Sequence, residues 1–143
     1  MDYADILKSK DAKANFIKGL VRMAKADGVI DQLENQYFMS AAYSLGLDQH
    51  QISEVEHCIN SNDVINVEFA SPIEKVLFFR ESIQLCAVDN MYDEKERAEV
   101  RAIAATMDIP EAVIRTIEDW VTEGMTWKKR GDELLIDLSE SFR

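Results

Sequence analysis

The sequence predicts an all-α fold, a pseudo-two-fold bundle of about seven or eight helices built from two repeated three-helix halves. Apolar residues recur at intervals of three and four along almost the whole chain, which is the period of amphipathic helices. Only 5 Gly and 2 Pro occur among 143 residues, whereas a β-sandwich or barrel needs many turn residues. The chain also repeats itself without a gap at a constant offset, which is the separation of Asp27 from Asp89. Its length is that of one ordinary domain, so residues 1–143 are treated as a single unit.

The first repeat is expected over about residues 13–60 and consists of three helices. Its first helix carries an apolar stripe formed by Phe16, Ile17, Leu20, Val21, Met23 and Ala24. A second helix begins at Asp31 and ends at Gly46, because glycine is favoured just past a helix C-terminus. Asp48 with Gln51 three residues later has the form of a capping box, which predicts the start of the third helix.

A polar connector over about residues 61–71 separates the two repeats. Positions 64–69 alternate in hydrophobicity, but the stretch is short and isolated, so no strand pair is expected. Pro72 suits the first turn of the next helix. The second repeat is expected over about residues 75–122, again as three helices.

The carboxyl end is expected to form a separate last helix over about residues 126–141, after a break or bend at Gly124. Trp120 is expected to pack as a lid on the core. Trp127 either anchors the last helix or belongs to a docking patch, because Trp, Met and Arg are enriched at interfaces. The basic block Lys128-Lys129-Arg130 is too short to indicate DNA binding, and it could pair with an acidic turn of the same chain or of a second subunit.

The repeat places six carboxylates in equivalent positions of two turns, here called the acidic turns (residues 27–34 and 89–96): Asp27, Asp31 and Glu34 in the first, and Asp89, Asp93 and Glu96 in the second. Gly28 and Asn90 follow the first aspartate of each turn, and these residue types best tolerate positive φ. Ile30 and Tyr92 are expected to pack against the core and so fix the start of the next helix. The register of acidic and apolar positions together indicates an internal duplication.

The acidic turns have a structural interpretation. Asp31 and Glu34, like Asp93 and Glu96, have the spacing of N-terminal helix caps, and acid in the first turn is favoured by the helix dipole. One such cap contributes about 1 kcal/mol. The first aspartates of the two turns are explained less well, because they lie at a helix C-terminus, where the dipole disfavours negative charge.

A cation site is the alternative interpretation. Three carboxylates within eight residues suit hard cations, and their spacing resembles the second half of an EF-hand loop. The first two ligand positions of such a loop would be Met23 and Lys25 in one turn and Leu85 and Ala87 in the other, so a complete EF-hand is excluded. A weaker site for Ca²⁺, Mg²⁺, Mn²⁺ or Zn²⁺, or one that both turns share, stays open. No other cofactor is expected.

The sequence around the first turn resembles the TerB-like domains, the family of the bacterial tellurite-resistance protein TerB and of the amino-terminal region of the DjlA co-chaperone. The resemblance rests on residues 23–34 and on the small and apolar residues at 41–47. Residues 86–109 resemble the second acidic motif of the family, with Asn90 in place of a glycine. The resemblance covers about residues 13–121. It implies an all-helical, pseudo-symmetric fold, a role in metal stress or in membrane-associated stress complexes, and metal ligation by the six carboxylates.

The net charge of −11 disfavours nucleic acid and acidic membranes as partners, because both are anionic. A protein partner is expected, in line with the stress complexes that the resemblance implies, and a homodimer is a further option. The first ten residues lack the apolar core of a signal peptide, and no apolar stretch approaches the ~18 residues of a membrane span. The protein is therefore expected to be cytoplasmic, without membrane insertion and with Cys58 and Cys86 reduced.

Catalysis is not expected, because the sequence has no GxSxG, HExxH, P-loop or GxGxxG motif. His50, Glu54 and His57 share one helical face, but the two histidines are about 10 Å apart along the axis, so a solvated face is expected rather than a transition-metal site. The sequence favours a non-enzymatic domain. It is either a cation-binding adaptor in tellurite or metal-stress physiology or a purely structural protein–protein interaction module.

Overall fold

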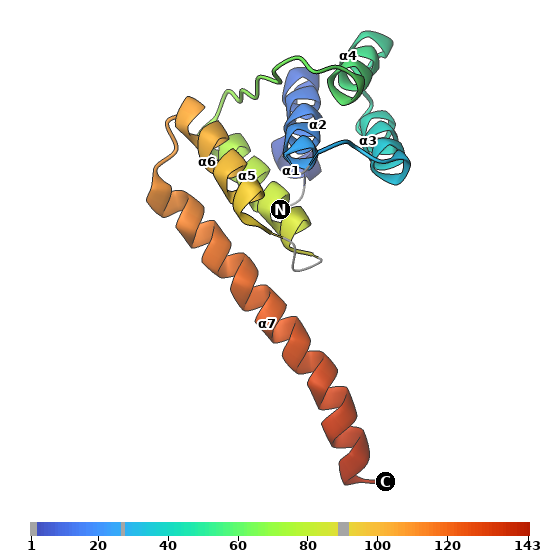
Figure 1. The fold of residues 1–143 in the computed structure, drawn as a ribbon, viewed down its shortest axis with the longest axis vertical. Coiled ribbons are helices and arrows are strands. Elements are labelled where there is room, and N and C mark those ends of the chain that lie inside the picture. The colour runs from blue at the N-terminus through green and yellow to red at the C-terminus, as the bar shows by residue number, and fades with distance from the viewer. Residues whose placement is uncertain (1–2, 27, 89–91) are drawn as a thin grey trace.

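The computed structural model describes residues 3–26, 28–88 and 92–143, and helices dominate these ranges (Figure 1). Within them no strand occurs, so the all-α prediction is confirmed. The helices in chain order are α1 (Tyr3–Ile6), α2 (Lys10–Lys25), α3 (Gln32–Ser44), α4 (Gln49–Asn60), α5 (Pro72–Ala87), α6 (Glu94–Thr106) and α7 (Glu111–Ser141).

The expected number of about seven or eight bundle helices was wrong. Six helices in the described ranges have twelve or more residues, while α1 is a single turn of four residues. The separate last helix at 126–141 was also wrong, because α7 runs through Gly124 without a break for 31 residues. A glycine inside a helix costs about 1 kcal/mol relative to alanine, which is too little to end a long helix on its own.

The six long helices form two groups. In the first group α2 packs against α3 and α4, and in the second α5 packs against α6 and α7. Contact between α2 and α5 joins the groups, and α1 packs against α5. Figure 1 shows this division, with α3 and α4 on one side of α2 and with α5, α6 and α7 on the other. One continuous core runs between them and contains residues from every long helix.

Aromatic rings fill the centre of the contact between α2 and α5. Phe78 is fully buried, and its ring lies 6.3 Å from that of Phe16, 5.6 Å from that of Phe69 and 5.2 Å from that of Phe79. A Cβ on Gly19 would lie 2.3 Å from a ring carbon of Phe78. Because a glycine stands at this point of α2, the Phe78 ring of α5 can lie directly against the backbone of α2.

Helix boundaries recur along the chain at the offset of the sequence repeat. Both ends of α5 are displaced from those of α2 by this offset, and both ends of α6 are displaced from those of α3 in the same way. The start of α7 stands in the same relation to the start of α4. This recurrence agrees with the duplication predicted from the sequence. The pseudo-two-fold relation of the halves in space stays a prediction.

The recurrence extends to the C-terminal caps of α3 and α6. Gly46 has a φ of 76° and Asp108 a φ of 57°, which is the left-handed conformation in both cases. The amide of the following residue donates to the carbonyl oxygen of Ala42 (3.2 Å) in the first repeat and of Ala104 (3.0 Å) in the second. Aspartate tolerates this conformation better than most residues with a Cβ. The predicted end of the second helix at Gly46 is confirmed.

The connector between the repeats is extended but forms no strand. Ile65 and Val67 are buried and Phe69 packs partly against the core, while the residues between them are exposed. The alternation at positions 64–69 therefore reflects an extended segment with one face on the core.

The end of α7 projects from the bundle (Figure 1). Residues 126–143, here called the arm, are all exposed. The expected lid on the core was wrong, because Trp120 is 50% exposed, and Trp127 at 79% exposure does not anchor the helix to the core either. None of the described helices combines the length and the apolar character that crossing a membrane requires.

Candidate functional site

Each acidic turn ends in a capping box. Oδ1 of Asp31 accepts from the amide of Glu34 at 2.7 Å, and Oε1 of Glu34 accepts from the amide of Asp31 at 3.3 Å. In the second turn the same two bonds join Asp93 and Glu96 at 2.9 and 3.2 Å. The predicted capping role of these four carboxylates is confirmed.

The same device begins two further helices. Asp48 and Gln51 form a capping box at α4, as predicted, and Ser71 and Glu74 form one at α5. Neither of these lies in an acidic turn. Capping is therefore a general feature of this bundle, and it accounts for the cap carboxylates of the acidic turns without any ligand.

The remaining two predicted ligands, Asp27 and Asp89, lie outside the described residues. Gly28 takes a φ of 128°, as expected for the turn after α2. Among the residues that the structure describes, no group of three or more His, Cys, Asp or Glu side chains is arranged to hold a metal ion. Asp27 and Asp89 are not among those residues, so the metal site at the acidic turns stays a prediction.

The basic side chains near the end of α2 bind groups on α4, on α6 and in the connector. Arg22 pairs with Glu99 of α6 and donates through Nη1 to the carbonyl oxygen of Ile65 at 3.1 Å. Lys25 donates through Nζ to the carbonyl oxygens of Cys58 and Ser61 at the end of α4. These two side chains join α2 to α6 and α4. They also border a hollow of about 420 Å³ beside the first acidic turn.

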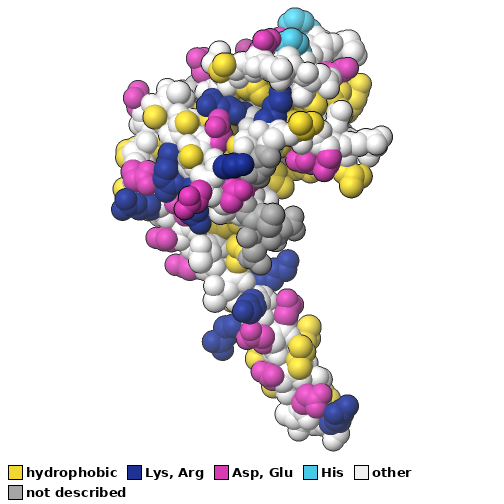
Figure 2. Space-filling view, viewed as in Figure 1, with side chains coloured by type: hydrophobic (Ala, Val, Ile, Leu, Met, Phe, Trp, Pro, Cys, Tyr) yellow, Lys and Arg dark blue, Asp and Glu magenta, His cyan; other side chains and the backbone are white. Residues whose placement is uncertain are grey.

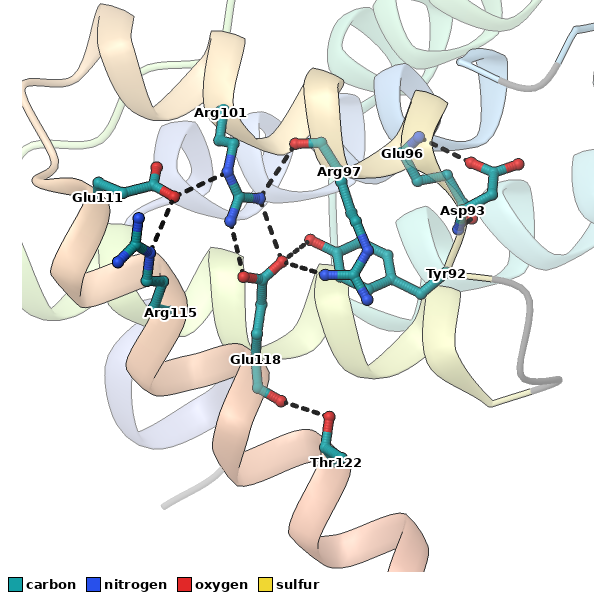
Figure 3. Close-up of polar contacts among 9 residues, drawn as sticks. All are labelled: Tyr92, Asp93, Glu96, Arg97, Arg101, Glu111, Arg115, Glu118 and Thr122. Carbon is teal, nitrogen blue, oxygen red and sulfur yellow. Dashed lines mark hydrogen bonds and ion pairs between the residues drawn. The ribbon is translucent and has the colours of Figure 1, made fainter.

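The second acidic turn is fastened to α7 by one carboxylate (Figure 3). Oε2 of Glu118 accepts from the hydroxyl of Tyr92 at 2.7 Å and from Arg97 at 3.0 Å. Arg101 donates to both oxygens of Glu118, at 2.8 and 3.1 Å. The guanidinium of Arg97 also lies over the ring of Tyr92, 4.3 Å from its centre. The Glu118 network therefore binds the first half of α6 to the first third of α7.

Electrostatics favour the charged form of Glu118, whose side chain is only 11% exposed. Burial raises its pKa, but the hydrogen bonds from Arg101 and Tyr92 and the positive charges of Arg101 and Arg97 outweigh burial, so the pKa lies below its ordinary value. For Tyr92, burial and then the bond to Glu118 raise the pKa of the hydroxyl. The pair thus holds an ionised carboxylate against a neutral phenol.

In the part of the chain that the structure describes, the first half shows no counterpart of the Glu118 network. Glu56 occupies the position of the first repeat that is equivalent to Glu118, but it is exposed. Ile30 stands where the second turn has Tyr92, and it packs partly against the core. This network was not predicted from the sequence. The only signal was the pair Arg97 and Arg101, one helical turn apart, and no sequence pattern joins them to α7.

The His50 face forms no metal site among the described residues. Nε2 of His50 lies 2.8 Å from Glu54, which also binds Lys18, whereas His57 lies 2.8 Å from Asp63. These side chains border a shallow hollow of about 330 Å³ with Cys58, whose thiol pKa is raised by burial. Both histidines are exposed, as the expected solvated face requires.

The caps make a direct prediction about the acidic turns. Replacing Asp31 or Asp93 by alanine should lower the free energy of unfolding by about 1 kcal/mol, because an amide of the first helical turn loses its acceptor. Asparagine caps as well as aspartate, so Asp31→Asn and Asp93→Asn should be nearly neutral. Urea unfolding followed by far-ultraviolet circular dichroism measures both. Asp48→Ala, which removes the same kind of cap outside the acidic turns, is the matched control. If the asparagine and alanine variants lost equal free energy of unfolding, the charge of the aspartate rather than its cap bond would matter.

Known proteins resemble this chain in two ways, through a family match over its first part and through a similar solved structure. Residues 1–57 match the family described as tellurite resistance protein TerB. A crystal structure of a tellurite resistance protein from Nostoc punctiforme is similar, with a TM-score of 0.56 and 21% identity over 90% of this chain and 82% of that chain. At this identity the likeness shows the fold. No curated protein matches the chain significantly.

Proposed function

We propose that this chain, whose predicted resemblance to the TerB-like family is confirmed by the family match and by the similar fold, is a non-enzymatic domain of tellurite or metal-stress physiology. In this proposal it binds a divalent cation through its acidic turns and acts as an adaptor for a protein partner. The observation that carries the proposal is the pair of acidic turns, which occupy equivalent positions of the two repeats and share the same capping geometry.

The first acidic turn is the better placed of the two for an ion. Asp31 is exposed and Glu34 is partly exposed, whereas Glu96 of the second turn is buried. The capping bonds of the first turn use Oδ1 of Asp31 and Oε1 of Glu34. A cation at the second oxygens would therefore leave the cap intact, and hard cations prefer such oxygen ligands.

A bound cation would act through charge. The chain carries a net charge of −11, and a divalent ion at an acidic turn removes repulsion between neighbouring carboxylates. Ion binding would therefore stabilise the packing of the two halves in which the carboxylates of the turn lie close enough to contact the ion. The partner surface would follow that packing.

The test is a titration of the full chain with Ca²⁺, Mg²⁺, Mn²⁺ and Zn²⁺, followed by calorimetry and by NMR. We expect amide shifts near residues 28–34 with at least one ion. Asp27→Asn together with Asp89→Asn should abolish the response, while Asp48→Asn, at a cap outside the turns, should not change it. No response at millimolar ion would rule out the cation site.

The alternative is a purely structural protein–protein interaction module. Capping accounts for four of the six carboxylates, and the second turn is already held by the Glu118 network. Under this alternative, Asp27→Asn and Asp89→Asn change neither ion response nor partner binding. An ion titration and a pull-down with an identified partner, each carried out on both variants, distinguish the two functions.

A further inference from the structure

The arm exposes more apolar surface than a solvated helix needs. Its residues include Trp127, Leu134, Leu135, Ile136, Leu138 and Phe142, each 48–81% exposed. In Figure 2 basic side chains gather where the arm leaves the bundle, hydrophobic and acidic ones follow, and a basic side chain lies again near the tip. Helices of this length derive most of their stability in water from packing of an apolar face. The arm has no such packing among the described residues.

Six arm and near-arm residues lie along one stripe. Their spacing alternates between four and three residues, which is the heptad seam of a two-helix coiled coil, and we call them the seam: Trp120, Gly124, Trp127, Gly131, Leu134 and Leu138. Leu135 borders the seam, while Ile136 points to the opposite side of the helix. A single seam is the pattern of a helix with one partner helix.

Two glycines in the seam are not required by any close contact among the described residues. Gly124 and Gly131 lie in the interior of α7, where each costs about 1 kcal/mol relative to alanine. An added Cβ at either position would meet no described atom within 4 Å. Each glycine stands between two large seam residues, so the stripe alternates large and small from Trp120 to Leu134. Such a surface offers knobs and holes to a copy of itself.

The charge of the arm favours a second copy of the chain as the partner. The arm carries four cationic side chains (Lys128, Lys129, Arg130 and Arg143) and four anionic ones (Asp132, Glu133, Asp137 and Glu140), so its formal charge is zero in a chain of −11. Two arms can therefore approach without the repulsion that separates the bundles, and a neutral arm gains nothing from anionic lipid. Three of the cations (residues 128–130) come before the anions and Arg143 comes after them, so antiparallel arms bring the basic block of each copy opposite the acidic stretch of the other.

We propose that two copies of this chain dimerise through antiparallel arms, with Trp127 opposite Leu138 of the second copy and Gly131 opposite Leu134 of the second copy. In this register Arg130 and Asp137, which each precede a seam residue, face each other twice across the dyad. The bundles then lie at opposite ends of the paired arms. This inference goes beyond the proposed cation site and does not depend on it.

The other registers are disfavoured. A shift far toward the bundles would place the second arm against Ile117, which is buried in its own core. A shift of one heptad toward the bundles puts Arg130 opposite Arg130 of the second copy. A shift of one heptad toward the tips puts Asp137 opposite Asp137 of the second copy. Both registers bring like charges together. The register centred between Gly131 and Leu134 avoids these problems.

Sedimentation equilibrium of the full chain across a concentration series tests the dimer. Leu134→Glu should raise the dimer dissociation constant at least about 30-fold, because it buries an unpaired charge in the seam. Ile136→Glu, with the same change on the opposite side of the same helix, should leave the constant within about twofold. Far-ultraviolet circular dichroism verifies that both variants keep the bundle. A wild-type chain that is monomeric at every concentration overturns the proposal.

A charge exchange tests the orientation. Arg130→Asp alone and Asp137→Arg alone should each weaken the dimer about tenfold, and the double variant should restore it, because the two positions face each other only in the antiparallel register. Failure of the double variant to restore the dimer overturns that register. Co-sedimentation of the wild-type chain, but not of Leu134→Glu, with phosphatidylcholine vesicles would instead assign the arm to a lipid surface and would also overturn the proposal.

Discussion

Replacing Phe78 by alanine is expected to lower the free energy of unfolding by about 3–5 kcal/mol. The ring is fully buried and touches aromatic side chains from α2, from the connector and from α5 itself. It also fills the space that Gly19 leaves on α2. Its removal opens a cavity where the two groups of helices meet, and neither backbone can collapse into the gap without moving a whole helix.

Such a loss is a large part of the roughly 5–15 kcal/mol that stabilises an ordinary domain. Urea unfolding measured by far-ultraviolet circular dichroism is the suitable assay, because Trp120 and Trp127 are exposed and would report the core poorly by fluorescence. Ile73→Ala on the same helix is the control. Ile73 is 48% exposed, so truncating it should lower the free energy of unfolding by only about 1 kcal/mol. Equal effects at the two positions would contradict the central role of the ring.

Glu118→Gln should lower the free energy of unfolding by about 2 kcal/mol, because the carboxylate accepts four hydrogen bonds, three of them from arginine. Glu111→Gln is a matched control on the same helix. Glu111 also binds Arg101, but its side chain is 46% exposed, so its loss should stay below about 1 kcal/mol. Chemical unfolding at pH 7 compares the two variants.

The pH dependence of the Glu118 effect has a defined sign. The folded state lowers the pKa of Glu118 below the ordinary value of 4.5, so its contribution is complete above that value and is lost as pH falls through the lower folded pKa. The difference between the wild-type chain and Glu118→Gln should therefore be constant from about pH 6 to 8 and shrink below about pH 4. A difference that grows in acid would show that the carboxylate is not stabilised in its charged form.

Local sequence signals predict the starts of the helices correctly. Asp31, Asp48 and Asp93 were each predicted to cap a helix, and each does so with the reciprocal bond that its partner three residues later supplies. Gly46 ends its helix as predicted. These features depend on residues within one turn of one another, so the chain specifies them before any tertiary contact forms.

Features that depend on the rest of the fold are predicted less well from the sequence. Gly124 did not end a helix, because one interior glycine costs only about 1 kcal/mol and its immediate neighbours Glu123 and Met125 favour a helix. The exposure of Trp120 depends on where α7 leaves the bundle, and hydrophobicity alone does not contain that information. The Glu118 network was missed for the same reason: its donors lie 17–26 residues before it, and only the packing of α6 on α7 brings them together.

The uninterrupted course of α7 ties the direction of the arm to the core. Ile114, Ile117 and Val121 are buried and fix the rotation of the helix about its axis. Each residue turns a helix by about 100°, so inserting or deleting one residue at position 124 would swing the seam a quarter-turn or more away from its original bearing. The packing of α7 on the bundle thus fixes the direction in which the seam faces. The number of helical residues between the bundle and the arm therefore matters to a partner as much as the side chains of the arm do.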